Sequence, residues 1–577
     1  MEFKALNVSY SSLKNAINIK FFSIITILLN TFCVIFGVLY ITFSVYILAW
    51  DIFGIILPIT FFENLFLIYL SSSQVEKSTK NGHRIYQFCV TFLIYTMLSL
   101  FGIMGGNLLL SAIIVNNGFI IIFSYFLIYF FYFSLLILSI ILAIYDLKYF
   151  NNKRLHPIAQ KQPNSVFIQK KSIKQLLKKP LNIISTIIFM LSALFAIVIV
   201  FGSFEIITTF IAIIASQFGI FFSLIFFANL ILKLNLKRDI WSKSKYKKRL
   251  FLGLVISGVL MLPLLFKNIS IFNGDRSFLE LLGPDWNLNI PEAQKNHFLS
   301  TPYTTSGYFL GSKPKECLTE VNIKFYNDGE INLFFDVYMP LNYGINLPGE
   351  NSTLIRIHGG AWVSGDKGTF NNVQVNKYFA AQGYIVFDIQ YGLRNLVPSS
   401  SSDISGDYNI DDMVGHIAAF THFLTNNYKK YGANLNSVFI SGGSSGGHLS
   451  SVVALATANG EFFPIFSQNL TIKGFIPLYP ANGMVSFFGI DGNEDFIHPE
   501  NLIRSDSPPC LIYQGTHDIL NYFNIANNFR SAYKENGNYN CSILWFPLAG
   551  HGSDFYFSGY YNQIFLYYME RFMYFFH

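Results

Sequence analysis

Residues 441–448 read Ser-Gly-Gly-Ser-Ser-Gly-Gly-His and lie between two apolar runs, Ser437–Ile440 and Leu449–Ala456. The first run is predicted to be a strand and the second to be a helix. A Gly-x-Ser-x-Gly sequence at a strand-to-helix turn is typical of a nucleophile elbow, in which small neighbours let a serine occupy a strained turn. The free N–H groups of the following helix then face the place where negative charge develops. Two registers fit, one centred on Ser444 and one on Ser445, and the local pattern leaves both open.

The segments around this motif alternate between short apolar runs and helical stretches. Val321–Tyr326 and Ile331–Tyr338 flank Asn-Asp-Gly, which predicts a β-hairpin. Further strands and one clear helix are expected at Thr353–Ile357, Tyr384–Gln390, Leu511–Gln514 and Ser542–Phe546, and at Asp411–Tyr431. This alternation predicts βαβ units and a mainly parallel sheet with helices on both faces.

A second motif lies about 85 residues before the serine motif, directly after the strand expected at Leu354–Ile357. The motifs that follow one another along this half are HGGAW at 358–362, GDK at 365–367, GYIVFDIQYGL at 383–393 and GGSSGGHL at 442–449. In this order they resemble the α/β-hydrolase fold, in its carboxylesterase branch near the hormone-sensitive-lipase and feruloyl-esterase-like members. The resemblance covers roughly residues 315–577 and implies a serine esterase or lipase.

The resemblance also implies roles for individual residues. Ser444 aligns with the nucleophile, and Ser445 stands where alanine is usual. The oxyanion hole is implied to consist of the backbone N–H groups of Gly359, Gly360 and Ser445, while His358 orients their loop. Ala361 stands where many members have a third glycine.

The acid and the base are expected to follow the serine in that order. Asp518 follows a strand in a Gly-Thr-x-Asp turn that matches the acid turn of the family, and His551 lies in Gly-His-Gly after the next strand. The rival acids Asp506 and Asp554 are expected to be solvated surface carboxylates. His448 and His517 are interpreted as structural.

This constellation predicts a mechanism in which His551 takes the proton of Ser444 while Asp518 holds the imidazole tautomer. Such chemistry requires neither a metal nor an organic cofactor. The five cysteines show no CxxC spacing, which indicates neither a zinc site nor a disulfide framework. An alternative is acyl transfer by the same three residues to an alcohol or amine.

The N-terminal half has a different composition. Residues 1–267 carry a formal net charge of +17, whereas residues 268–577 carry −10. The acidic second half argues against a nucleic-acid partner, because phosphate requires clustered cations. Seven apolar stretches are long enough to cross a bilayer, at about 21–46, 52–71, 86–105, 119–145, 182–204, 206–232 and 250–267.

The connections between these stretches alternate in charge. The N-terminal tail and the second, fourth and sixth connections are basic, whereas the first, third and fifth contain no Lys or Arg. Because Lys and Arg concentrate in cytoplasmic loops, the N-terminus is predicted to be cytoplasmic and the second half lumenal or extracellular. The expected partners are thus the bilayer and an ester substrate, with lipid esters among the candidates.

The predicted organisation is a cytoplasmic tail at 1–20, an all-α transmembrane bundle of about seven helices at 21–267, an irregular linker at 268–312 and an α/β-hydrolase domain at 313–577. Glu63 lies well inside the second span, where an ionisable residue is a functional candidate. Anchoring is favoured over transport, because no internal repeat or substrate motif is present. A transporter or receptor with a non-catalytic hydrolase-like domain is the rival interpretation.

Overall fold

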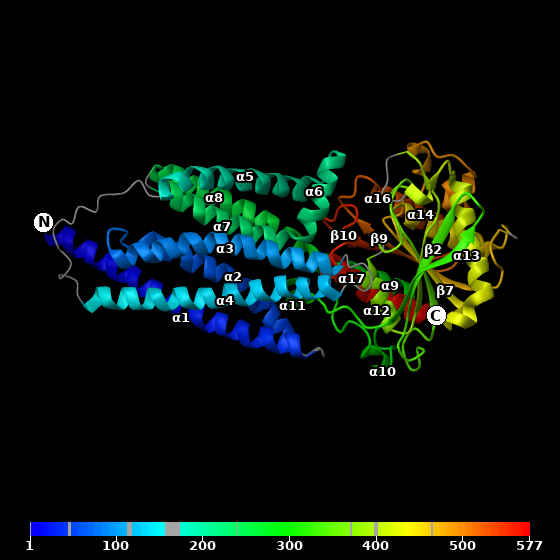
Figure 1. The fold of residues 1–577 in the computed structure, drawn as a ribbon, viewed down its shortest axis with the longest axis horizontal. Helices are drawn as coiled ribbons and strands as arrows, with labels where there is room; N and C mark the ends of the chain where they lie inside the picture. Colours follow the sequence, from blue (N-terminus) through cyan, green and yellow to red (C-terminus); the bar gives the residue numbers. More distant parts are fainter. Residues whose placement is uncertain are drawn as a thin grey trace.

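The structure is a computed structural model that describes residues 2–43, 48–111, 118–155, 173–238, 240–369, 372–396, 402–462 and 465–577. Figure 1 shows a long helical bundle at one end and an α/β domain at the other. The basic fourth connection of the sequence prediction falls partly on 156–172, outside the described residues.

Most of the bundle consists of long apolar helices. They are α1 (Glu2–Thr42), α2 (Ala49–Gln74), α3 (Lys80–Ser111), α4 (Gly118–Leu155), α5 (Ile173–Phe201), α7 (Gly219–Lys237) and α8 (Lys243–Leu260). Seven helical segments in the described chain are long and apolar enough to cross a membrane, and the seventh continues from α8 into α9 (Leu262–Leu282). The predicted number of seven is confirmed.

One predicted span is wrong. The stretch 206–232 is divided into α6 (Ile206–Gln217) and α7, with a break at Phe218. At this break the backbone of Gly219 packs closely on α8, and a Cβ there would lie 2.4 Å from the Leu260 carbonyl oxygen. The chain therefore turns, and α6 crosses the end of the bundle while α7 runs back through it (Figure 1).

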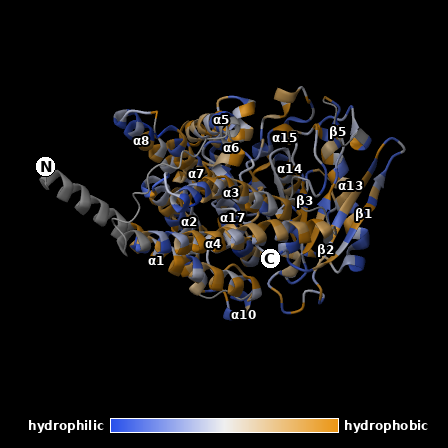
Figure 2. Cartoon of the chain, turned by 60° about the vertical axis from the view of Figure 1, so that its left-hand side comes forward, coloured by the Kyte–Doolittle hydropathy of each residue, from blue (hydrophilic) through white to orange (hydrophobic). Residues whose placement is uncertain are grey.

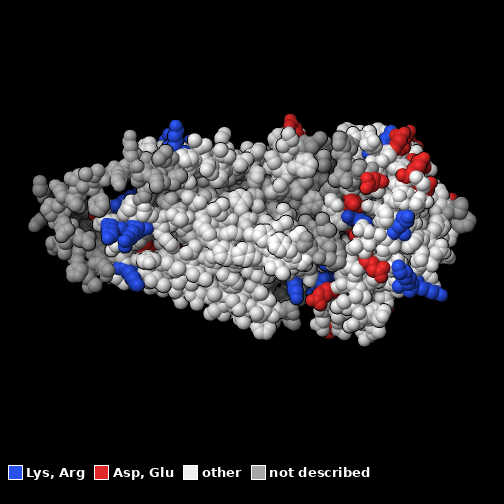
Figure 3. Space-filling model, in the orientation of Figure 1, with Lys and Arg blue, Asp and Glu red and all other residues white. Residues whose placement is uncertain are grey.

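Polarity is distributed along the bundle as a membrane requires. On the face drawn in Figure 3, and among the described residues, Lys and Arg gather at the end of the bundle far from the α/β domain, and its middle is uncharged. Figure 2 shows hydrophobic residues along the same helices. An uncharged middle with basic residues at one end is typical of helices that cross a bilayer.

The segment 268–312, expected to be an irregular linker, begins as helix because α9 continues to Leu282. It then contains the short helices α10 (Glu292–Lys295) and α11 (Thr305–Leu310). Helix α11 is buried, with Tyr308 and Phe309 fully inaccessible, and Asn107 of α3 donates a hydrogen bond of 3.0 Å to the Phe309 carbonyl. The linker thus packs into the end of the bundle.

The α/β domain contains one eight-stranded sheet, with strand order β1-β2-β4-β3-β7-β8-β9-β10. The strands are β1 (Leu318–Asn327), β2 (Asn332–Met339), β3 (Ser352–Ile357), β4 (Ile385–Ile389), β7 (Asn434–Gly443), β8 (Ile472–Leu478), β9 (Cys510–Gly515) and β10 (Cys541–Phe546). A separate two-stranded sheet joins β5 (Leu393–Arg394) and β6 (Ser405–Gly406). Strands β1 and β2 form the predicted hairpin, β2 is also antiparallel to β4, and the remaining pairs are parallel.

Strand β8 has no counterpart in the sequence prediction, although it lies between β7 and β9. Its sequence contains Gly474 and Pro477, which both argue against a central strand. Pro477 pairs with Gly442 of β7, so a strand with a proline occupies the middle of the sheet.

Helices cover both faces of the sheet and create two hydrophobic cores. The helices of this domain are α12 (Val373–Ala381), α13 (Ile410–Tyr431), α14 (Ser445–Asn459), α15 (Glu494–Ile497), α16 (Phe523–Glu535) and α17 (Tyr560–Phe576). Helices α13, α14 and α16 contribute to one core. The other contains residues of α12 and α17 together with residues of the bundle, so the two halves of the protein share a continuous interior.

Candidate active site

The predicted elbow lies where β7 ends and α14 begins. Ser444 has φ 58° and ψ −120°, a backbone conformation that a residue with a side chain rarely adopts. Its N–H donates to the Leu478 carbonyl of β8 at 2.9 Å. A Cβ at Gly446 would lie 2.2 Å from the Ile357 carbonyl oxygen of β3, so the turn fits only because this position is glycine. The neighbouring strands therefore hold the strained serine in place.

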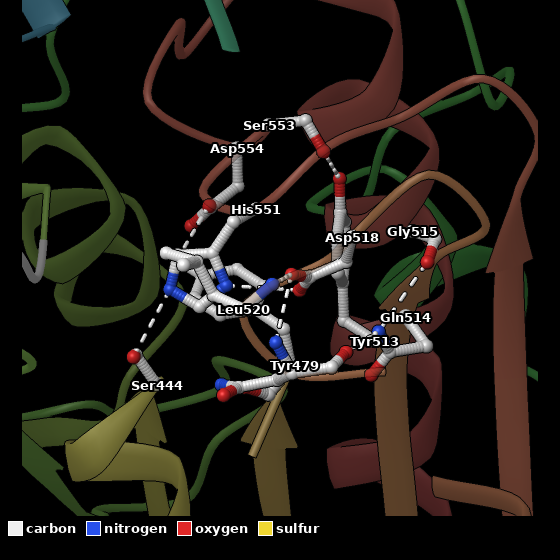
Figure 4. Close-up of polar contacts among 11 residues, drawn as sticks. Ser444, Tyr479, Tyr513, Gln514, Gly515, Asp518, Leu520, His551, Ser553 and Asp554 are labelled. Atoms are coloured by element: carbon white, nitrogen blue, oxygen red, sulfur yellow. Dashed lines mark hydrogen bonds and ion pairs between the residues drawn. The ribbon is translucent and has the colours of Figure 1, made fainter. Parts of the chain in front are cut away.

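A chain of hydrogen bonds starts at this serine (Figure 4). The Ser444 hydroxyl lies 3.0 Å from Nε2 of His551, and Nδ1 of His551 lies 2.9 Å from Oδ2 of Asp518. The other carboxylate oxygen of Asp518 accepts the N–H groups of Leu520 and Asn521, both at 2.9 Å. The Asp518 side chain is fully buried and that of His551 is 13% exposed. Because a carboxylate accepts, Nδ1 carries the proton and Nε2 is free to accept from the serine.

The three residues come from three different places in the chain. Ser444 follows β7, Asp518 lies in the turn after β9, and His551 lies in the turn after β10. The structure thus brings together the serine, acid and histidine that the sequence selected. Of the two registers left open, only Ser444 places its hydroxyl on the histidine, while the side chain of Ser445 is buried.

The loop after β3 runs beside the serine. A Cβ at Gly359 would lie 3.5 Å from the Ser444 Cβ and 2.6 Å from the Gly443 carbonyl oxygen. Within the described chain, the N–H groups of Gly359 and Gly360 donate to no protein acceptor. The N–H of Ser445 belongs to the first turn of α14, where a helix supplies no partner. In the described chain, three N–H groups in this loop and at the start of α14 are therefore without a protein acceptor.

His358 holds this loop and does not face the serine. Its fully buried ring donates from Nδ1 to the Gly359 carbonyl at 2.9 Å and stacks on Tyr391 with a centroid distance of 4.4 Å. Tyr391 donates its hydroxyl to the His358 carbonyl at 3.1 Å. Burial lowers the pKa of His358, which keeps the ring neutral. These contacts agree with a residue that orients the loop.

The two rival histidines lie elsewhere. His448 is fully buried with its ring edge-to-face to Trp362, and burial lowers its pKa to about 4. His517 is half-buried beside Gly202 at the end of α5. In the described structure neither ring forms a hydrogen bond with Ser444.

The two rival acids differ from each other. Asp506 is exposed, as expected. Asp554 is not a solvated carboxylate: it is buried, its carboxylate accepts the Tyr479 hydroxyl at 2.8 Å, and burial raises its pKa. The Tyr479 ring also packs edge-to-face on His551 with a centroid distance of 4.6 Å. Tyr479 was not identified from the sequence because it follows the unpredicted strand β8. The position of Asp554 three residues after His551 could have indicated that this carboxylate lies near the site.

Glu63 lies in the bundle, away from this site. Its carboxylate accepts the Thr26 hydroxyl of α1 at 2.7 Å. The neighbouring Asn64 exchanges hydrogen bonds of 2.6 and 3.0 Å with Asn30.

Comparisons with known proteins point to the same half of the chain. The model of the BD-FAE family matches residues 335–495. A probable carboxylic ester hydrolase, LipM of Mycobacterium tuberculosis, is 26% identical over a region that covers 30% of this chain and 43% of LipM. The chain thus spans less than half the length of that relative.

Two solved structures are similar at lower identity. Esterase 2 of Thermogutta terrifontis is 22% identical over 41% of this chain and 84% of its own, with a TM-score of 0.34. Esterase B of Lactobacillus rhamnosis is 21% identical over 42% of this chain and 81% of its own, with a TM-score of 0.36. The C-terminal half of the chain thus contains a mostly parallel α/β sheet, its residues 335–495 match the model of the BD-FAE family, and it is similar in sequence to a probable carboxylic ester hydrolase.

Proposed function

We propose that this protein is a membrane-anchored serine esterase that hydrolyses carboxylic esters through an acyl-serine intermediate. The observation that carries the proposal is the unbroken chain of hydrogen bonds from Ser444 through His551 to Asp518. A serine hydroxyl is a weak nucleophile at neutral pH and needs an adjacent base, which this chain supplies.

The proposed reaction has two halves. The Ser444 oxygen attacks the ester carbonyl while Nε2 of His551 takes its proton, and Asp518 stabilises the resulting imidazolium. The tetrahedral oxyanion is held by the N–H groups of Gly359, Gly360 and Ser445, each worth roughly 10²–10³ in rate. His551 then protonates the leaving alcohol. Water, deprotonated by the same nitrogen, attacks the acyl-serine; the acid is then released as His551 returns this proton to the Ser444 oxygen.

We also infer the orientation of the protein in its membrane. The basic connections support a cytoplasmic N-terminus, and an odd number of spans then places the esterase domain in a lumen or outside the cell. In sealed vesicles with the cytoplasmic face outward, protease should leave the esterase domain intact. Its digestion without detergent would contradict this orientation.

The esterase proposal is tested by labelling and by a matched pair of serine variants. A fluorophosphonate probe should label the native protein but not Ser444→Ala, which should also lose hydrolysis of p-nitrophenyl acetate. Ser445→Ala should keep substantial activity, because only the backbone N–H of Ser445 is used. Full activity in Ser444→Ala would overturn the proposal.

A further inference from the structure

Helix α6 has its apolar face outward. Ile207, Phe210 and Ile214 occupy one side of the helix and are 71%, 64% and 46% exposed. Phe204, just before the helix, is 62% exposed. The opposite side, with Thr208, Thr209, Ala212 and Ser216, is buried. This arrangement is the reverse of a surface helix on a soluble protein, whose exposed face is polar.

The buried side of α6 contacts the loop that carries His551. A Cβ at Gly550 would lie 3.3 Å from the Ala212 side chain. Gln217, the last residue of α6, accepts the Tyr556 N–H at 2.8 Å and donates to the Gly552 carbonyl at 3.4 Å. The histidine of the site thus lies between two residues that α6 contacts.

The turn that carries Asp518 also approaches this part of the bundle. A Cβ at Gly202, which follows α5, would lie 3.5 Å from the ring of His517. Figure 1 shows α6 at the junction of the bundle and the α/β domain, across the direction of the long helices. The segment from Gly202 to Gln217 therefore meets both the acid turn and the histidine loop.

The outward face of α6 continues the lipid-facing surface of the bundle. The preceding helix α5 is long and apolar enough to cross a membrane and exposes Ile197, Val200 and Phe201 toward the same end. An apolar face that lies across the direction of the spans and begins where one of them ends suits the boundary between headgroups and acyl chains. The occupant that fits this face is the bilayer itself.

We propose that α6 lies in the membrane interface and that the substrates of the esterase site are esters that reside in the bilayer, such as acylglycerols. An α-helix with its side chains is only about 10–12 Å across, so the histidine loop lies within one helix of the lipid. Ester carbonyls of glycerolipids lie near this boundary, between their polar and apolar parts. The inference rests on the proposed esterase function.

The test compares a bilayer-resident ester with a water-soluble one that shares its chromophore. Full-length protein is reconstituted in vesicles of ether-linked phosphatidylcholine, which contains no carboxylic ester, and given p-nitrophenyl palmitate or p-nitrophenyl acetate. The double variant Ile207→Ser/Phe210→Ser should hydrolyse the palmitate roughly tenfold more slowly, because two apolar side chains that would be buried in lipid are lost. Its acetate activity should stay within about twofold of native.

The matched control is Phe119→Ser/Ile122→Ser at the start of α4. Phe119 is 76% exposed and Ile122 is 71% exposed. This variant should keep the native ratio of palmitate to acetate activity. An unchanged ratio in the α6 variant, or an equal loss in the control, would overturn the inference. If Ser444-dependent acetate hydrolysis is absent from native protein, the esterase proposal itself fails.

A second measurement does not require that the double serine variant of α6 folds. With the photoreactive residue benzoylphenylalanine in place of Phe210, irradiation of native membranes should cross-link the protein to lipid. A cross-link to another protein would overturn the inference, because α6 would then be a protein interface.

Discussion

Two carboxylates in this chain accept hydrogen bonds inside very different surroundings. Asp518 in the α/β domain accepts from His551, Leu520 and Asn521. Glu63 in the bundle accepts from the Thr26 hydroxyl. The carboxylate of Asp518 reaches, through an imidazole, a hydroxyl at a strained turn, whereas the hydrogen bond of Glu63 ends on an ordinary helix residue. Under the proposed mechanism, a carboxylate contributes to catalysis when its hydrogen bonds lead to a group that can attack the substrate.

The largest expected effect comes from removing the charge of Asp518 while keeping its shape. In Asp518→Asn, one oxygen still accepts the backbone N–H groups, so the amide nitrogen faces Nδ1 of His551. The imidazole is then forced into the other tautomer, with its proton toward Ser444, and kcat should fall roughly 10⁴-fold. Steady-state hydrolysis of p-nitrophenyl acetate measures this loss. A variant with near-native kcat would show that the hydrogen-bond chain has no catalytic role.

The next effect concerns the backbone donors beside the serine. Gly359→Ala introduces a Cβ 2.6 Å from the Gly443 carbonyl oxygen, which is backbone and cannot swing away. The loop must therefore shift, and the loss of one aligned donor should lower kcat about 10²–10³-fold with a smaller change in KM. Gly415→Ala on α13 is the control, because no atom lies within 4 Å of a Cβ there. Equal kcat in both variants would argue against an oxyanion hole at this loop.

Much of the site could be predicted because its residues lie in short glycine-rich sequences that follow strands. The elbow, the loop at Gly359 and the turn at His551 are of this kind, and a turn that tolerates only glycine leaves a local signal. The burial of Asp554 left a weaker sequence signal, because it depends on the contact with Tyr479. Tyr479 in turn follows β8, a strand that contains Gly474 and Pro477. Local propensity disfavours β8, and its position between two strands outweighs that propensity.

In the N-terminal half, too, features that depend on tertiary contacts could not be predicted from local sequence. Hydropathy predicted seven long helices, because length and composition suffice for that count. Hydropathy placed α6 inside the predicted span 206–232, because the residues of α6 are as apolar as those of α7. The break at Phe218 depends on the close approach of Gly219 to Leu260, a tertiary contact that no window of sequence contains.

A third prediction concerns the effect of pH on stability through His448, a buried histidine outside the hydrogen-bond chain of the site. Burial lowers the pKa of His448 to about 4, so below pH 6.5 the unfolded chain binds a proton at this position that the folded protein does not. Stability should therefore fall as the pH drops from about 6.5 to 4, by up to ~1.4 kcal/mol per pH unit from this group. The thermal midpoint in detergent at pH 7 and pH 5 measures the loss.

His448→Phe should lose less stability than native over this range, while some loss remains because the pKa of His358 is also lowered. The control His422→Gln changes an exposed histidine of α13 and should behave like native protein. An identical acid loss in native protein and His448→Phe would mean that His448 is protonated equally in both states.

The smallest expected effect completes the comparison of the two carboxylates. Glu63→Gln makes the same carboxyl-to-amide change as Asp518→Asn, and its amide oxygen still accepts the Thr26 hydroxyl. Because Glu63 is connected to no residue of the site in the described structure, hydrolysis of p-nitrophenyl acetate should stay within about twofold of native. If Glu63→Gln instead lowers kcat as Asp518→Asn does, the bundle takes part in the reaction. Anchoring would then be an insufficient account of the membrane half, because the shared core would be transmitting the state of Glu63 to the histidine loop.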